Sequence, residues 1–314
     1  MNFVNLHLHS EYSLQDSVIQ MDKLAETLRE YNQNSVALTD HSSTAGWFNF
    51  NNEMNNNNIK PIFGNEFYMT NSYEEKSRKR YHLVCLAKNN EGVKNIRKLQ
   101  RIAVENFYYK PILSYEDLYK NKNGIVVLTA CSLSKSSQLI LDSKINEAKE
   151  FIQELYNEFQ DDLYIEYQFH PLYKEQSIIN EGLLNIMDEL SIPPVVTCDS
   201  HFLKKEDADV RKMIQAIAWH KKYNDISNSL PSNCLGNEEI VINNAEESNF
   251  SDMSIVNKAI HNTVKISDKC NPQLEEITRR IPSFTKEEEL RSLFNIEWGW
   301  EYNRIKRIIK RISI

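Results

Sequence analysis

Short apolar runs alternate with longer periodic segments from the amino terminus to Pro231. The short runs are rich in β-branched and aromatic residues and predict strands, whereas apolar residues at helical spacing predict helices. This alternation is typical of an α/β fold, and seven such strands predict a distorted TIM-like (β/α)7 barrel. The predicted strands span residues 3–9, 35–40, 61–69, 81–87, 124–130, 162–168 and 194–199. The predicted helices span residues 20–32, 44–57, 90–106, 144–159, 173–190 and 205–221.

One connection does not fit the alternation. The segment from Thr70 to Arg80 is charged, lacks an apolar stripe and is about as short as the dozen residues that a parallel crossover demands. We therefore expect a hairpin-like return between the flanking strands. Such a return would bring His82, at the start of its strand, to the same rim as Glu66, near the end of the preceding strand.

The alternation ends after Pro231. Residues 232–251 are polar and predict turns, and an amphipathic helix is expected from about Asp252 to Cys270. Isoleucines at helical spacing, separated by basic residues, predict a last helix near the carboxyl terminus, which we expect to pack on the barrel rather than bind nucleic acid or a membrane. The expected domains are a barrel over residues 1–231, a helical extension over 232–284 and a basic amphipathic helix over 285–314.

Composition narrows the class of protein. The 314 residues are 41% hydrophobic, which is enough for one large core. The five cysteines are widely spaced without a Cys-x-x-Cys pair, so the sequence predicts a reducing, cytoplasmic setting rather than a disulfide framework. No apolar stretch approaches the length of a membrane span, so we expect no membrane partner. The net charge of −7 implies that any contact with DNA is local.

Polar side chains with metal-binding chemistry lie at the ends of the predicted strands. His7 and His9 are two residues apart in an apolar run, so both side chains are expected on one face. Asp199 and His201 repeat this spacing at the last strand. Because the carboxyl ends of parallel barrel strands meet at one rim, these groups should converge on a metal site. The other candidates at strand ends are His41, Glu66 and Cys131.

Each of these residues also has a simpler interpretation. A single histidine is more often a hydrogen-bonded polar residue than a metal ligand. Asp16 could cap the helix that begins near Val18, and Glu66 could be a buried carboxylate paired with a cation. Cys131 could be a small buried residue. The two paired motifs favour the metal site over these alternatives.

The motifs resemble, in their order, the polymerase and histidinol phosphatase (PHP) domain at the amino end of bacterial DNA polymerase III alpha subunits. The resemblance runs from about residue 3 to about residue 284. It is carried by FVNLHLHSEYSLQD at 3–16, ALTDH at 37–41, KPIFGNE at 60–66, YHLVCLAKN at 81–89, FYYKP at 107–111 and CDSHF at 198–202.

The resemblance implies a distorted seven-stranded barrel that holds up to three divalent ions on nine ligands. The matching positions are His7, His9, Asp16, His41, Glu66, His82, Cys131, Asp199 and His201. By analogy with members that hold three ions, the first ion would lie on His7, His9, Glu66 and Asp199, the second on Asp16, His41 and His201, and the third on His82 and Cys131, with Glu66 bridging. The mixed nitrogen, oxygen and sulfur donors suit zinc, manganese or iron better than magnesium.

The chain also departs from the family pattern. Ser132 follows Cys131 where the family usually has a glycine, and the Gln168-Phe169-His170-Pro171 turn differs from the usual one. His170 is a candidate for substrate contact or proton donation, or has no role, and Glu166 is a candidate hydrogen-bond acceptor for a ligand imidazole. The sequence stops about where the polymerase palm of the family begins, so we expect no polymerase activity from this chain alone.

The predicted reaction is metal-dependent phosphoester hydrolysis. We expect a 3′–5′ exonuclease or related DNA-end-processing activity linked to replication, with a DNA 3′ end or single strand as substrate. The expected catalytic groups are the nine ligands other than His82 and Cys131, with His170 as a further candidate. The candidate substrate contacts are Arg80, Tyr108, Tyr109 and Lys110, which could equally be solvated surface.

Two other functions remain open. The chain could be a catalytically silent, metal-stabilised module that docks on a DNA polymerase or another replication protein. It could instead be a small-molecule phosphomonoesterase of the histidinol phosphatase type. A metal-dependent amidohydrolase shares the His-x-His motif, but the Asp199-x-His201 pair fits a phosphoesterase better.

Overall fold

One curled, mixed sheet forms the centre of the fold. The computed structural model describes residues 3–74, 78–226 and 230–274. The strands lie in the order β1-β2-β3-β5-β6-β7, and the short strand β4 pairs with β2. Their bounds are β1 Ser35–Leu38, β2 Lys60–Thr70, β3 Tyr81–Ala87, β4 Leu113–Ser114, β5 Ile125–Leu128, β6 Leu163–Gln168 and β7 Pro194–Thr197.

The strand directions confirm the expected hairpin. β1 and β2 are parallel, as are β5, β6 and β7, whereas β3 runs antiparallel to both of its neighbours, β2 and β5. The register pairs Tyr68 with His82 and Glu66 with Val84. The start of β3 therefore lies beside the end of β2, at the rim where His82 was expected.

The predicted first strand, residues 3–9, forms isolated bridges rather than a continuous strand. Asn5 bridges to Val36 of β1, and Leu8 bridges to Ser200 just after β7. The amide of His9 donates to the carbonyl of Ser200 at 2.9 Å, and the amide of Ser200 donates to the carbonyl of His7 at 3.1 Å. This segment joins the two edges of the curled sheet, so the expected distorted α/β barrel is confirmed.

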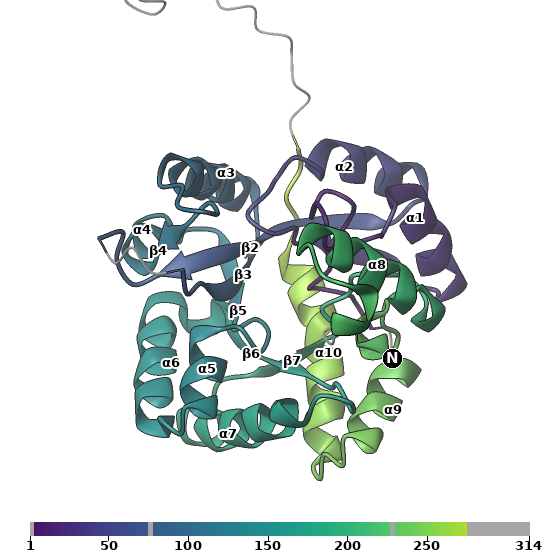
Figure 1. Cartoon of the computed structure of the whole chain (residues 1–314). Helices are drawn as coiled ribbons and strands as arrows, with labels where there is room; N and C mark the ends of the chain where they lie inside the picture. Colours follow the sequence, from purple (N-terminus) through teal and green to yellow (C-terminus); the bar gives the residue numbers. More distant parts are fainter. Residues whose placement is uncertain (1–2, 75–77, 227–229, 275–314) are drawn as a thin grey trace, which may run out of the picture. The chain divides into compact units, whose positions relative to one another are not determined.

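The predicted helices are present and surround the sheet (Figure 1). In the part of the chain that the structure describes, three helices are additional to the prediction. The predicted helices are α1 Met21–Glu30, α2 Trp47–Asn56, α3 Asn90–Glu105, α6 Ile145–Phe159, α7 Lys174–Leu190, α8 Ala208–Ala218 and α10 Met253–Lys269. The additional ones are α4 Tyr115–Lys120, α5 Lys135–Leu141 and α9 Glu238–Glu247. Single turns of 3-10 helix cover Gln160–Asp162, Lys205–Asp207, Tyr223–Asp225 and Pro231–Asn233.

Helix α9 corrects the expectation of turns over residues 232–251. The Asn237 side chain accepts a hydrogen bond from the amide of Ile240, which caps the helix start, and Val241 and Ala245 bury one face. Helices α4 and α5 begin at capping serines in the same way, but they are too short for apolar periodicity to reveal them. The predicted helix in residues 285–314, and the end of the 232–284 extension, lie outside the described residues.

Apolar side chains fill the barrel below the rim. Ile62 and Glu66 lie four residues apart on β2 and therefore face the same side, so one strand supplies both core and rim. Lys60 and Ser35, at the starts of β2 and β1, hydrogen-bond to Ser267 of α10, which therefore lies at the end of these strands away from Glu66. The inner cluster consists of Val4, Leu6, Ala37, Ile62, Val84, Leu86, Val126, Leu128, Ala130, Tyr164, Val195, Ile266 and Cys270.

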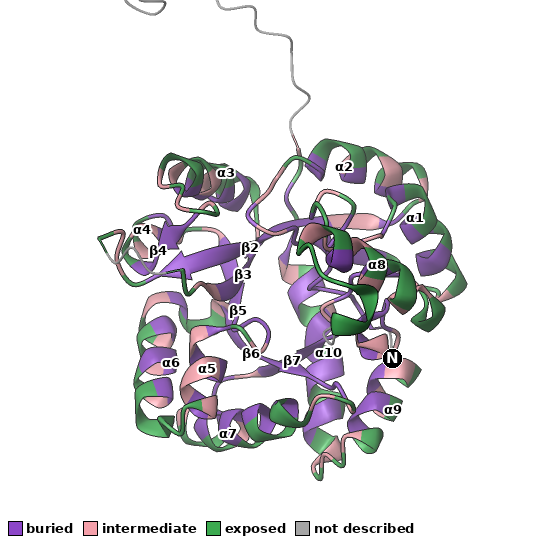
Figure 2. Cartoon of the chain, viewed as in Figure 1, coloured by how far each residue is buried: buried purple, intermediate pink, exposed green. Residues whose placement is uncertain are grey.

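A second, larger cluster packs between the sheet and the helices. Figure 2 shows the strands coloured as buried over most of their length, apart from the start of β2, and the outer helices buried along only part of their surface. None of the helices that the structure describes is long and apolar enough to cross a membrane.

The outer core makes a testable stability prediction. Phe63 is fully buried, with its ring 5.3 Å from that of Trp47 and 6.1 Å from that of Phe50. Phe63→Ala should lower the free energy of unfolding by about 3–5 kcal/mol because it leaves a cavity. Phe48 lies on α2 with Trp47 and Phe50, but its side chain is 59% exposed. Phe48→Ala should therefore change the free energy of unfolding by no more than about 0.5 kcal/mol. Urea denaturation measures both, and equal losses in the two variants would contradict this packing.

Candidate metal centre

The nine predicted ligands meet at one rim of the barrel. His7 and His9 come from the segment that joins the sheet edges, and Asp16 follows in the next loop. His41, Cys131, Asp199 and His201 follow β1, β5 and β7, Glu66 lies in β2, and His82 begins the reversed strand β3. Residues far apart in the sequence thus come into contact.

Glu66 lies in the middle of this group. Its carboxylate is buried, and its two oxygens are close to side-chain atoms of five of the other eight predicted ligands. The distances are 3.3 Å to His7 Nε2, 3.2 Å to His9 Nε2, 2.8 Å to His41 Nδ1, 2.9 Å to His82 Nδ1 and 3.7 Å to Cys131 Sγ.

Two further carboxylates complete the group. Asp199 Oδ1 lies 3.2 Å from His7 Nε2 and 3.3 Å from His9 Nε2. Asp16 Oδ2 lies 3.1 Å from His41 Nε2 and 3.3 Å from His201 Nε2. Asp16 does not cap a helix, since α1 begins only at Met21 and its first residues have no side-chain cap.

The backbone after β7 is shaped to aim Asp199 into the site. Asp199 has a φ of 48°, in the left-handed region that aspartate tolerates better than most residues. The Asn233 side-chain amide donates to the carbonyls of Cys198 and Asp199 and holds this turn. His201 Nδ1 lies 2.7 Å from the carbonyl oxygen of Asp199, which leaves Nε2 directed toward Asp16.

Six buried polar atoms in the centre have no hydrogen-bond partner. They are His7 Nε2, His9 Nε2, His41 Nδ1, Glu66 Oε2, Asp199 Oδ1 and His201 Nε2. Several lie only 2.8–3.3 Å apart as imidazole–carboxylate ion pairs, but none of these contacts meets hydrogen-bond geometry. Leaving one buried polar group unsatisfied costs about 1–3 kcal/mol, so a group of six requires an explanation. Divalent cations would satisfy all six.

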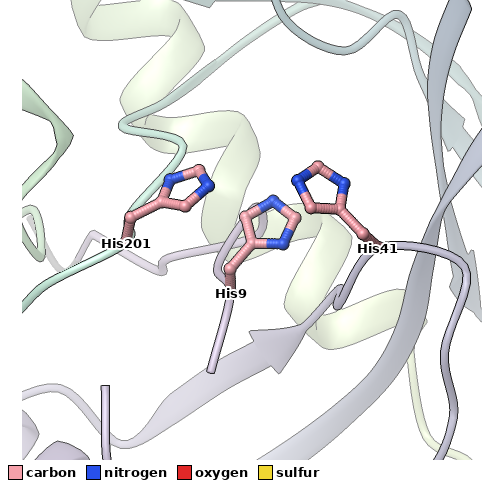
Figure 3. A group of neighbouring side chains, drawn as sticks. All are labelled: His9, His41 and His201. Atoms are coloured by element: carbon pink, nitrogen blue, oxygen red, sulfur yellow. The ribbon is translucent and has the colours of Figure 1, made fainter. Parts of the chain in front are cut away.

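Three overlapping sets of donors are compact enough to hold an ion. The donor atoms of each set lie within 4.8 Å of one another. Figure 3 shows one of the sets, in which His9, His41 and His201 approach from three separate segments. The sets are His7–His9–Glu66, His9–His41–His201 and His41–Glu66–His82.

Hydrogen bonds on the far side of two imidazoles fix their orientation. His7 Nδ1 lies 2.7 Å from Glu166 Oε1, the contact expected for Glu166. His9 Nδ1 lies 3.0 Å from Ser13 Oγ, whose hydroxyl donates to Asp40. Donation through Nδ1 leaves the Nε2 lone pair of each ring facing the centre, as a metal ligand requires.

Opposite charges dominate the electrostatics of the centre. Burial alone would lower the pKa of His41, but the carboxylates of Glu66 and Asp16 outweigh it and raise the pKa to about 9. The pKa of His7 is also raised, because Glu166, Asp199 and Glu66 outweigh its burial. Burial opposes ionisation of Glu66, yet the surrounding histidines hold its pKa well below the usual value. Without a bound cation, His7 and His41 thus keep their protons and Glu66 keeps its negative charge, whereas burial and the nearby charge of Arg211 lower the pKa of His201 to about 4.

Cys131 lies beside this group. Its sulfur is 3.5 Å from His82 Nδ1. Burial, reinforced by the charge of Glu66, raises the pKa of the Cys131 thiol, so the sulfur is protonated when no cation is bound. A thiol must lose this proton to become a metal ligand.

The geometry of His170 favours a supporting role over proton donation. Burial lowers the pKa of His170 to about 4, so its ring is neutral at pH 7. Its nitrogens lie 2.8 Å from Ser232 Oγ and 3.2 Å from Gln168 Oε1. The Gln168 amide in turn donates to Glu166 Oε1, so His170 connects indirectly to His7.

The four candidate substrate contacts divide into two groups. Lys110 Nζ donates to the Tyr68 hydroxyl at 2.7 Å, and the Tyr68 ring stacks on His41 with ring centroids 5.3 Å apart. Lys110 therefore adjoins the centre. Arg80 donates to the carbonyl of Tyr108 at 3.0 Å, and the side chain of Tyr109 is exposed. Arg80, Tyr108 and Tyr109 therefore belong to the second group, which lies at the surface of the protein.

A cavity of about 280 Å³ opens onto the centre and reveals residues absent from the prediction. Its lining includes Asp16, Asp199 and His201 together with Arg211 and Gln215 of α8. Arg211 is buried and donates from Nε to the Asp16 carbonyl at 3.0 Å and from Nη2 to Asp16 Oδ1 at 2.9 Å. The only signal in the sequence was a charged residue on the inner face of an otherwise ordinary amphipathic helix.

The geometry and the family comparison agree. The model of the PHP domain family matches residues 5–170, more than half of the chain, and the chain therefore belongs to this family. It is 34% identical over 278 residues to DNA polymerase III subunit alpha of Borreliella burgdorferi, which covers 86% of this chain and 24% of that protein. It is 32% identical over 238 residues to the same subunit of Aquifex aeolicus, which covers 72% of this chain and 20% of that protein. The chain thus spans about a quarter or less of these relatives.

A solved structure resembles the fold more distantly. It is a two-domain protein from Bacteroides vulgatus that contains a predicted PHP-like metal-dependent phosphoesterase. The TM-score is 0.39 at 14% sequence identity, and the match covers 64% of this chain and 52% of that protein.

The raised pKa of His41 predicts that metal uptake releases protons. At pH 7 the His41 ring is protonated without metal, because its pKa is about 9, and a cation must displace that proton. Affinity for manganese should therefore increase as the pH rises from 6.5 toward 9. Calorimetry in two buffers of different ionisation enthalpy should show net proton release, reduced in His41→Asn. His261 is exposed on α10, so His261→Asn should match the wild type. Binding without proton release at pH 7 would contradict the prediction.

Proposed function

We propose that this chain is a metal-dependent phosphoesterase that hydrolyses phosphodiester bonds at a centre of up to three divalent ions. The observation that carries the proposal is the group of six buried nitrogen and oxygen atoms at the rim that have no hydrogen-bond partner, several of them close enough together to hold an ion. A purely structural metal site is normally closed by its four ligands, whereas this centre opens into a cavity large enough for a phosphoryl group.

The proposed ligand sets follow the family pattern. His7, His9, Glu66 and Asp199 would hold one ion, Asp16, His41 and His201 a second, and His82 and Cys131 a third, with Glu66 shared between ions. Bound zinc, manganese or iron would activate a water molecule for attack on phosphorus and stabilise charge on the phosphoryl oxygens. Glu166 and Ser13 keep the rings of His7 and His9 turned toward the ions.

The proposed substrate is a DNA 3′ end or single strand, cleaved in the 3′–5′ direction. Lys110, which donates to Tyr68 next to His41, would neutralise a backbone phosphate close to the centre. The exposed ring of Tyr109 lies under the guanidinium of Arg78, at 4.2 Å, and offers an aromatic face to an unpaired base. Arg80 and Tyr108 continue this surface.

The similarity to polymerase III alpha subunits supports a role in replication. We propose that the chain acts in the cytoplasm together with a DNA polymerase or another replication protein. A DNA-end-processing activity fits this setting, since replication generates the 3′ ends on which it would act.

A cleavage assay tests the proposal. The chain loaded with manganese or zinc is offered end-labelled single-stranded DNA, duplex DNA and a generic phosphomonoester. We expect stepwise loss of 3′ nucleotides that falls at least about 100-fold in Asp199→Asn and His9→Ala, because each variant removes a proposed ligand. The exposed-histidine variant His261→Asn should retain the wild-type rate.

The same assay separates the alternatives. Cleavage of the monoester alone would replace the proposal with a small-molecule phosphomonoesterase. Bound metal without turnover of any of the three substrates would support a silent docking module. Hydrolysis that persists unchanged in both ligand variants would show that the activity does not arise at this centre.

A further inference from the structure

Arg211 makes a contact that the proposed ligand sets do not include. Its Nε and Nη2 hold the main-chain and side-chain oxygens of Asp16, and the Gln215 amide donates to the same Oδ1 at 3.1 Å. Oδ1 of Asp16 is thereby occupied by α8, and Oδ2 alone is left to face His41 and His201. Arg211 therefore fixes which oxygen Asp16 presents to the centre.

The guanidinium is not fully used by this contact. A guanidinium has five N–H groups, and the two bonds to Asp16 engage one at Nε and one at Nη2. Among the described residues, Nη1 has no hydrogen-bond partner, and it is not among the buried atoms that lack one, so solvent reaches it. Arg211 lines the cavity together with Asp199 and His201, so the cavity is the space beside it in which a ligand could meet Nη1.

A cation in this position recognises an anion with several oxygens. Arg211 is 6% exposed, so its charge is screened less than that of a surface side chain. Asp16 holds the planar guanidinium by Nε and Nη2, so the orientation of Nη1 is already fixed before a ligand binds. This arrangement suits bidentate or paired contacts to phosphate oxygens. Lysine would not provide both edges at once.

We propose that Arg211 is a substrate-binding residue that donates from Nη1 to a non-bridging oxygen of the phosphoryl group held in the cavity. The ligand class is a phosphate ester or free phosphate. This role rests on the proposed phosphoesterase function, but phosphate binding can be measured without any hydrolysis. A chain that binds phosphate through Arg211 and cleaves no DNA would disprove the proposed function and leave this inference intact.

The test uses the full chain loaded with manganese and freed of unbound metal, with inorganic phosphate as the probe in calorimetry. Arg211→Gln should weaken phosphate binding at least about 10-fold, because it removes a charged hydrogen-bond donor from a buried site. Manganese stoichiometry and the melting temperature are measured in parallel. The control is Lys212, the next residue on α8, whose ammonium lies 4.3 Å from the centre of the Tyr223 ring. Lys212→Gln also removes one positive charge from α8 but leaves the contact of Arg211 with Asp16 in place, so this variant should bind phosphate normally.

The outcomes separate substrate contact from a structural role. Unchanged phosphate affinity in Arg211→Gln with full manganese content would overturn the proposal. If Arg211→Gln loses manganese, Arg211→Lys decides, because it keeps a cation beside Asp16. Weakened phosphate binding in a manganese-replete Arg211→Lys supports the proposal, whereas wild-type phosphate affinity in that variant rejects it. Loss of manganese in both variants would assign Arg211 to Asp16 alone and also reject it.

Discussion

The buried carboxylate of Glu66 is the constraint around which the rim is organised. A carboxylate at 1% exposure is stable only with compensating charge, and here the compensation comes from imidazoles on separate segments of the chain. His7, His41 and His82 each approach it within 3.3 Å. The segments that carry these rings must therefore be held in register, and the barrel is the structure that does so.

Two departures from a regular parallel barrel serve this constraint. Because β3 runs in the reverse direction, its first residues rather than its last lie at the rim. His82, the second residue of β3, thereby reaches Glu66. The segment at residues 3–9 bridges both sheet edges through only a few main-chain hydrogen bonds. Its irregular path leaves His7 and His9 directed at the same carboxylates while Leu6 and Leu8 pack in the two apolar clusters.

The centre extends outward through hydrogen bonds that fix the orientation of several of its side chains. The Glu166 carboxylate accepts hydrogen bonds from the His7 ring, the main-chain amide of Ala130, and the side chains of Gln168 and Thr197. One carboxylate thus connects the ends of β5, β6 and β7 to a proposed ligand. Arg211 does the same for Asp16 from α8. Such outer contacts orient donor atoms before any ion arrives, which limits the rearrangement that binding requires.

The sequence by itself determined what depends on local geometry. Alternation of apolar runs placed six strands and seven helices among the described residues, the His7-x-His9 spacing placed two imidazoles on one face, and a short charged link indicated the hairpin before His82. The Asp199-x-His201 spacing indicated the second pair, but these residues lie in the turn after β7, and the positive φ of Asp199, not strand alternation, directs them to the centre. The short capped helices α4 and α5 escaped because about two turns give too little periodicity. Only the tertiary structure brought Arg211 to Asp16 across 195 residues and gathered six buried polar atoms without hydrogen-bond partners at one rim, since contacts between distant segments depend on how the whole barrel closes.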